Sequence, residues 1–180
     1  MKGIVFTEFL EMVEIKYSAD MVDQILEDSA LPSGGIYTSV GTYDHAEMIS
    51  LLGELAKHTG LGTQALLCTF GEYLFGRFAA LYPELFQPTT NPLTFLSKVD
   101  DYIHVEIRKL YPDAELPEFE CQSPRSGSLH MIYRSDRPFA SLAEGLIRGC
   151  IAHYDARVDV QIEDLCEGKN TSVRFLLTET

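Results

Sequence analysis

Basic residues are scarce in this sequence. Lys and Arg together number 14 against 27 Asp and Glu, which gives a net charge of −13. A surplus of negative charge repels phosphate backbones and anionic lipid headgroups. We therefore expect neither nucleic acid nor a membrane surface as a partner.

Long apolar runs are also missing. The richest stretch, ALLCTFGEYLFGRFAALY, is interrupted by Glu72 and Arg77, so no segment matches the apolar length of a bilayer. The opening MKGIVFTEFLEMVEIKY mixes acidic and apolar residues and lacks the basic start of a secretion signal. We expect a soluble, cytoplasmic protein without membrane insertion. Since 46% of its 180 residues are hydrophobic, residues 1–180 can bury a substantial core and are predicted to form a single domain.

Closely spaced cysteines are absent. Cys68, Cys121, Cys150 and Cys166 form no CxxC pair, so a disulfide framework is not expected and simple burial is. The five histidines show no i, i+4 pair and no Cys partner at zinc-finger spacing. A site that gathers Cys150, His153 and Cys166 through folding stays open, because spacing cannot exclude it.

The motifs of common enzymes are missing as well. The sequence contains no GxSxG elbow, P-loop, HExxH zinc motif or GxGxxG fingerprint. No activated nucleophile or acid-base pair is evident either. The protein is therefore not expected to be an enzyme.

The apolar pattern that is present divides the chain into two parts. Up to residue 111 the spacing is mainly helical, and after Pro117 it mainly alternates. We predict an α+β fold, with 1–111 mainly helical and 112–180 mixed. Caps and breakers mark the expected helix ends in the first part, at Ser18, Asp44, Gly60, Thr63 and Pro83.

One further helix is predicted across NPLTFLSKVDDYIHVEIRKLYP. Asn91 is its expected N-cap, Pro92 occupies the first helical position and Pro112 lies beyond its end. His104 borders a stripe at three- and four-residue steps and should face inward. The stripe consists of Leu93, Leu96, Asp100, Ile103, Ile107 and Leu110.

The second part reads as strand, strand, helix, strand, strand. Segments around FEC and SLHMIYR are expected strands separated by the turn-rich QSPRSG, and Pro138 introduces a helix. The alternating RVDVQIE and SVRFLLT flank an expected turn at Gly168, Lys169 and Asn170. This order predicts a four-stranded antiparallel sheet with one helix.

Two groups of residues could carry chemistry. An inward imidazole such as His104 can supply the single protein bond to haem iron, although an isolated inward His is more often a core residue with a satisfied hydrogen bond. In YRSDR, alternation aims Tyr133, Ser135 and Arg137 to one side, where a phenol, a hydroxyl and a guanidinium can bind carboxylates such as haem propionates. The alternative for this string alone is a solvated strand end.

In order and spacing, His104, Pro117 and the YRSDR string resemble the H-NOX (haem nitric oxide/oxygen binding) family, in its stand-alone bacterial form. The opening MKGIVF and the two-part pattern extend the resemblance over essentially the whole chain. The resemblance implies haem b between the helical half and the mixed half. It makes His104 the iron ligand and assigns Tyr133, Ser135 and Arg137 to the propionates.

Three apolar positions also take roles from this resemblance. Pro117 is expected to press the porphyrin out of plane, and Ile4 to contact it. Leu142 matches the position at which oxygen-binding relatives carry a tyrosine, and the chain has no Trp to support such a residue. We therefore expect selectivity for nitric oxide, with carbon monoxide as a second ligand, unless another tyrosine such as Tyr73 enters the pocket.

The resemblance further implies signalling in trans. Stand-alone family members regulate a histidine kinase or a cyclic-di-GMP enzyme, so a haem-based nitric oxide sensor acting on such a partner is the expected function. One alternative is a haem-independent redox or zinc switch using Cys68, Cys121, Cys150, Cys166 and His153. Another is a module that binds a different apolar ligand in the same pocket.

Overall fold

The computed structural model of the protein describes residues 1–86, 89–165 and 171–180. Four helices come first, α1 (Gly3–Lys16), α2 (Ala19–Asp28), α3 (His45–Thr59) and α4 (Thr63–Leu81). Short helical segments follow, η1 (Pro83–Leu85), α5 (Pro92–Leu96), η2 (Val99–Ile103) and α6 (His104–Leu110). The last elements are β1 (Glu118–Gln122), β2 (Ser128–Ser135), α7 (Ala140–His153), β3 (Val158–Asp164) and β4 (Thr171–Glu179). The predicted α+β class and the order of the second part are confirmed.

Local capping chemistry sets the helix ends where the sequence predicts them. The hydroxyl of Ser18 accepts a hydrogen bond from the backbone N–H of Met21 at 3.1 Å, and the carboxylate of Asp44 accepts one from Ala46 at 2.9 Å. At the end of α3, Gly60 has φ 71°, the left-handed conformation that glycine adopts without a Cβ clash. These predictions needed only local rules.

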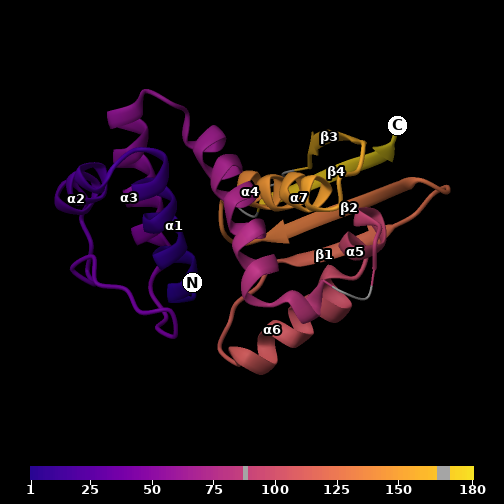
Figure 1. The fold of residues 1–180 in the computed structure, drawn as a ribbon, viewed down its shortest axis with the longest axis horizontal. Helices are drawn as coiled ribbons and strands as arrows, with labels where there is room; N and C mark the ends of the chain where they lie inside the picture. Colours follow the sequence, from indigo (N-terminus) through magenta and orange to yellow (C-terminus); the bar gives the residue numbers. More distant parts are fainter. Residues whose placement is uncertain (87–88, 166–170) are drawn as a thin grey trace.

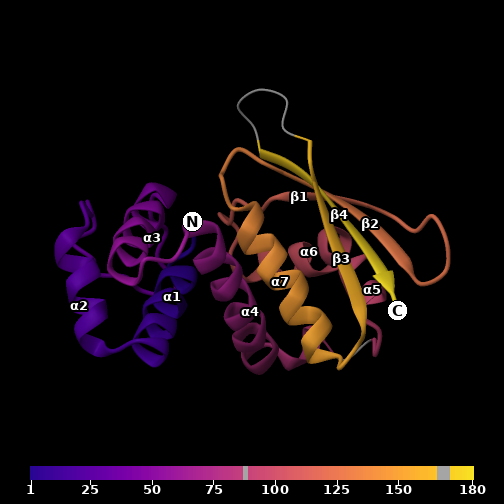
Figure 2. The same ribbon diagram turned by 90° about the horizontal axis from the view of Figure 1, so that it is seen from above.

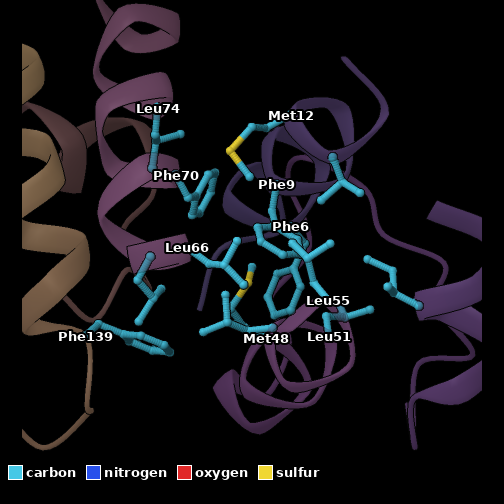
Figure 3. Close-up of a cluster of buried hydrophobic side chains, with 14 residues drawn as sticks. Phe6, Phe9, Met12, Met48, Leu51, Leu55, Leu66, Phe70, Leu74 and Phe139 are labelled. Carbon is cyan, nitrogen blue, oxygen red and sulfur yellow. The ribbon is translucent and has the colours of Figure 1, made fainter. Parts of the chain in front are cut away.

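The first helices share one apolar core. Figure 3 shows side chains of α1, α3 and α4 converging, with Phe6 and Phe9 facing Phe70 and Leu51. The rings of Phe9 and Phe70 meet edge to face at 5.2 Å, and both are fully buried. Full burial of a phenylalanine stabilises the fold by about 1.5 to 3 kcal/mol. Phe139, just before α7, also joins this cluster and so connects the helical part to the mixed part.

The sheet is antiparallel throughout, with strand order β1-β2-β4-β3. Alternate residues of its two central strands are buried, namely Leu129, Met131, Tyr133, Val173, Phe175 and Leu177. These residues pack with α5 and α7 in a second apolar cluster. The expected turn at Gly168, Lys169 and Asn170 lies outside the described residues.

Helices α4 and α7 join the two parts (Figure 2). Glycines allow the two backbones to touch: a Cβ on Gly145 would lie 2.0 Å from the carbonyl oxygen of Cys68, and one on Gly71 would lie 2.4 Å from that of Leu142. In both views, α1, α2 and α3 lie on one side of α4, and α7 and the sheet lie on the other (Figures 1 and 2). No helix in the described ranges is long and apolar enough to cross a membrane.

The predicted helix after Asn91 begins as expected but does not continue unbroken. The Asn91 side chain accepts a hydrogen bond from the N–H of Thr94 at 3.0 Å, which confirms the N-cap. The helix then breaks into α5, the π turn η2 and α6. In the π turn, the backbone N–H of Ile103 reaches back five residues to the carbonyl of Lys98 at 3.3 Å.

This break makes part of the predicted stripe wrong. A π turn contains more residues per turn than an α-helix, so it rotates the face that follows it. Leu110 is consequently 54% exposed, although the stripe placed it on the buried face. His104, the first residue of α6, is buried as predicted.

Candidate functional site

A cavity of about 920 Å³ lies between the helical part and the sheet. Helices α1, α4, α6 and α7, the π turn η2 and strands β1 and β2 all contribute to its lining. All seven residues singled out from the sequence line it, namely Ile4, His104, Pro117, Tyr133, Ser135, Arg137 and Leu142. Tertiary structure thus brings together residues as far apart in the chain as Ile4 and Leu142.

His104 provides the cavity with a buried imidazole. Its Nδ1 lies 3.0 Å from Oδ1 of Asp100, one turn earlier, and the residue is 8% exposed. Burial lowers the pKa of His104 below its ordinary value of 6.5, and the hydrogen bond to Asp100 only partly opposes this effect. The ring is therefore neutral at pH 7, with the proton on Nδ1 donated to Asp100. Nε2 then carries the lone pair that a metal requires.

Aromatic contacts connect this imidazole to the sheet. The ring of Phe119 lies 5.8 Å from that of His104 and 5.5 Å from that of Tyr133. Phe119 and Tyr133 are also direct partners in the register of β1 and β2. Burial raises the pKa of Tyr133, so its phenol keeps its proton and can donate a hydrogen bond. Sequence reasoning missed Phe119, which carries no signal beyond a strand position.

Ser135 and Arg137 lie where β2 ends. The backbone N–H of Arg137 donates to the hydroxyl of Ser135 at 3.1 Å, which fixes the turn that leaves the strand. The guanidinium of Arg137 is mostly buried and forms an ion pair with the carboxylate of Glu115. Glu115 itself is exposed, so this carboxylate can be displaced into solvent. The predicted phenol, hydroxyl and guanidinium therefore all line the same cavity.

Another part of the lining is apolar. Ile4 from α1, Leu74 from α4 and Leu142 from α7 line it together with Leu146. Pro117 lies in the segment that leads from α6 into β1. Tyr73, the tyrosine considered as an intruder, does not line the cavity but packs against the apolar core of α1, α3 and α4.

A second histidine lines the cavity and was not singled out from the sequence. His45 begins α3, and its ring meets that of Phe139 edge to face at 6.1 Å. Its Nδ1 lies 3.4 Å from the carboxylate of Asp44, and about a third of the side chain is exposed. No apolar stripe or spacing could have indicated it, because only tertiary packing brings the start of α3 to this space.

The alternative of a metal switch receives no support from the described residues. Within residues 1–86, 89–165 and 171–180, no three His, Cys, Asp or Glu side chains converge to hold a metal ion. Cys150 is fully buried, and burial raises the pKa of its thiol. Cys68 and Cys121 are half-buried, also with raised pKa values. Cys166 lies outside the described residues, so the set of Cys150, His153 and Cys166 is not tested.

The side chains around the cavity fit a haem. A flat apolar macrocycle suits the apolar wall, an iron suits a neutral imidazole with a free Nε2, and two carboxylates suit the donors of Tyr133, Ser135 and Arg137. The cavity volume is also in the range of ligand pockets, about 300 to 1,000 Å³.

Comparison with known families decides the classification. Residues 2–162 match the family described as haem-NO-binding. The chain belongs to this H-NOX family. H-NOX proteins are haem-binding gas sensors, which agrees with the cavity and its donors.

Solved structures agree with this assignment. An H-NOX protein from K. algicida, solved in the unliganded Fe(II) state, is 39% identical, with a TM-score of 0.94 and coverage of 100% of this chain and 97% of that one. One from Shewanella woodyi in the Fe(II)CO state is 37% identical, with a TM-score of 0.84 and coverage of 100% and 95%. One from S. oneidensis in the Fe(II)NO state is 23% identical, with a TM-score of 0.92 and coverage of 100% and 99%, and shows the shared fold alone. A search of the curated proteins found no match.

Proposed function

We propose that the chain is a haem-based nitric oxide sensor that holds ferrous haem b through Nε2 of His104. One observation carries this proposal. A buried imidazole with Nδ1 committed to Asp100 shares a cavity with the carboxylate-binding donors Tyr133, Ser135 and Arg137. A histidine buried only for packing would not require these donors in the same cavity.

Selectivity for nitric oxide follows from the apolar wall. When bound, the ferrous haem supplies an open coordination position that takes nitric oxide or, as a second ligand, carbon monoxide. Bound oxygen is polar and depends on a hydrogen-bond donor that Leu142 and Leu74 cannot provide. The H-NOX protein from S. oneidensis has been solved in the Fe(II)NO state, and the one from Shewanella woodyi in the Fe(II)CO state.

The chain's own moving part is His104 with helix α6. We propose that Nε2 of His104 would hold the iron, and that a gas-dependent shift of His104 with α6 against Pro117 and β1 would carry the signal. The helical part, α1 to α3, would then move relative to the sheet; it contacts the rest of the chain through the apolar core that it shares with α4 and through ion pairs. Lys2 binds Asp113 at 3.1 Å, and Arg77 binds the buried Glu8 at 2.6 Å. The arrangement before this movement and the arrangement after it would be the two states that a signal needs.

The proposed output is a separate signalling protein in the cytoplasm, either a histidine kinase or a cyclic-di-GMP enzyme. The choice rests on the likeness to stand-alone H-NOX proteins. The net charge of −13 favours a protein partner over nucleic acid. No catalytic role is proposed for this chain.

Replacing His104 tests the proposal. In the reduced protein, His104→Ala is expected to abolish the absorption spectrum of a histidine-bound, five-coordinate ferrous haem, and free imidazole added to the cavity should restore it. His45→Ala and His130→Ala are the matched controls, because His45 lines the same cavity and His130 lies on β2 outside it. Both controls should keep the spectrum and its change with nitric oxide. A normal spectrum and nitric oxide response in His104→Ala would refute the proposed ligand.

A further inference from the structure

Asp100 joins the predicted iron ligand to the sheet. Its Oδ1 lies 3.0 Å from Nδ1 of His104 and accepts a second, longer hydrogen bond from the backbone N–H of Phe119 at 3.4 Å. Phe119 is the second residue of β1, and Pro117 comes just before that strand. One carboxylate oxygen thus touches both the imidazole and the strand that follows Pro117.

The π turn places this carboxylate. The N–H groups of Tyr102 and Ile103 both bond the carbonyl of Lys98, at 2.9 and 3.3 Å, and the N–H of His104 bonds that of Val99. This widened turn lies against β1, and Asp100 lies at the point of contact. π turns of this kind occur often at functional sites, where they redirect side chains.

We propose that Asp100 is the positioning residue for His104 and ties the imidazole to strand β1. The inference rests on the proposed function, since it concerns how the iron ligand is held. Asp100 would act through His104 without touching the haem.

Two consequences follow from the hydrogen bond. An acceptor at Nδ1 holds the proton there, so that Nε2 always presents its lone pair and the ring keeps one orientation. A charged acceptor also makes the imidazole a stronger donor to the metal than a neutral one would. Because the same oxygen holds the N–H of Phe119, any displacement of His104 is passed to the start of β1.

The neighbouring residue supplies a matched control. Asp101 has the same side chain and charge and belongs to the same π turn, but it is exposed. Asp101→Asn and Asp100→Asn therefore change the net charge equally, and only the latter weakens the contact with His104. Asp100→Leu removes the acceptor altogether.

The test uses the haem-loaded, reduced protein and two measurements. Resonance Raman spectroscopy should give the highest iron-histidine stretching frequency for the parent and Asp101→Asn, a lower one for Asp100→Asn and the lowest for Asp100→Leu. Transfer of haem to an excess of an acceptor globin should be about 10-fold faster or more in Asp100→Leu, because loss of such a contact typically weakens metal binding about 10- to 100-fold. A purely structural role would lower stability and leave the stretching frequency of the bound fraction unchanged.

The outcomes separate this inference from the proposed function. If Asp100→Asn and Asp100→Leu keep the parent's stretching frequency and transfer rate, Asp100 does not position the ligand, whatever His104→Ala shows. If His104→Ala keeps a normal spectrum, the proposed function itself is wrong. Should Asp100→Leu fail to fold, the nearly isosteric Asp100→Asn still decides, because its frequency either falls below that of Asp101→Asn or does not.

Discussion

The two walls of the cavity differ in both chemistry and construction. The wall formed by α1, α4 and α7 consists of regular helices and presents apolar side chains such as Ile4 and Leu142. The wall formed by η2, α6 and β1 is built from short, broken elements and presents His104 with its partner Asp100. In Figure 1, α6 lies at the lower middle of the molecule, away from the helices α2 and α3 on the left.

This difference has a physical reason. A gas site that excludes donors needs only apolar packing, which regular helices provide through their spacing. A ligand that must be held in one orientation needs a second polar group at a defined distance. The π turn supplies that group at the cost of helical regularity.

The largest effect is expected from forcing apart α4 and α7, two of the helices that form the apolar wall. A Cβ on Gly145 would lie 2.0 Å from the backbone oxygen of Cys68, which cannot move aside as a flexible side chain could. Gly145→Ala should therefore lower the free energy of unfolding by about 3 kcal/mol or more, measured by urea denaturation of the haem-loaded protein. Gly76→Ala in the same α4 is the control, because no atom lies within 4 Å of its Cβ. It should raise stability by about 0.5 to 1 kcal/mol, and equal effects of the two would contradict the close contact.

A donor in the apolar wall should remove much of the chemical difference between the walls. Leu142→Tyr places a phenol in the cavity, and a hydrogen bond of about 1.5 to 3 kcal/mol to bound oxygen corresponds to roughly 10- to 100-fold tighter oxygen binding. Oxygen titration of the reduced protein, followed by absorbance, measures this change. Leu142→Phe carries the same ring without the hydroxyl and should bind no oxygen. If both variants respond alike, the hydroxyl does not reach the gas.

A smaller effect is expected at Arg137, the residue proposed to bind a propionate. Arg137→Ala removes the guanidinium, and the loss of haem should become about 10-fold faster. This is the lower end of the effect expected for a hydrogen bond to a charged group, because Glu115 already shares this guanidinium. Haem transfer to an acceptor globin measures the rate. Arg174→Ala, on β4 outside the cavity, removes an exposed pair with Glu163 and should leave the rate unchanged. An unchanged rate in Arg137→Ala would exclude this residue from propionate binding.

The smallest effect is expected from the thiols. Burial raises the pKa of Cys121 to about 11, so at pH 8 only about one thiol in a thousand is a thiolate, compared with about a quarter for a free cysteine. Iodoacetamide at pH 8 should therefore modify Cys121 and Cys150 slowly and leave the haem spectrum unchanged, and the rate at Cys121 should rise as the pH approaches 11. Mass spectrometry of the peptides measures each site. Rapid modification that altered the nitric oxide response would favour the redox switch instead.

Residues with local signals were predicted well. Ser18, Asp44 and Asn91 cap helices as short-range hydrogen-bonding rules predict, and the alternating segments form the four strands of one sheet. The inward direction of His104 was also predicted, because burial of its face depends on neighbours within the same segment. The seven candidate site residues were selected by resemblance as well as by pattern, and all of them line one cavity.

Other features depended on contacts between distant segments. The π turn η2 could not be predicted, because the apolar spacing from Leu93 to Leu110 fits an unbroken helix. Asp100 counted only as a position in that stripe, since its link to Phe119 requires β1 to lie alongside. His45 gave no signal for the same reason.

The sequence by itself determined the helix caps, the alternation of the strands and the kinds of donor available to a haem, because these depend on residue type and short-range geometry. Only the tertiary structure decided which of those donors meet. It packed α7 against α4 at Gly145, closed a cavity around His104 and brought β1 to Asp100. Such contacts join residues far apart in the chain, and their free energy is realised only when the whole core is packed.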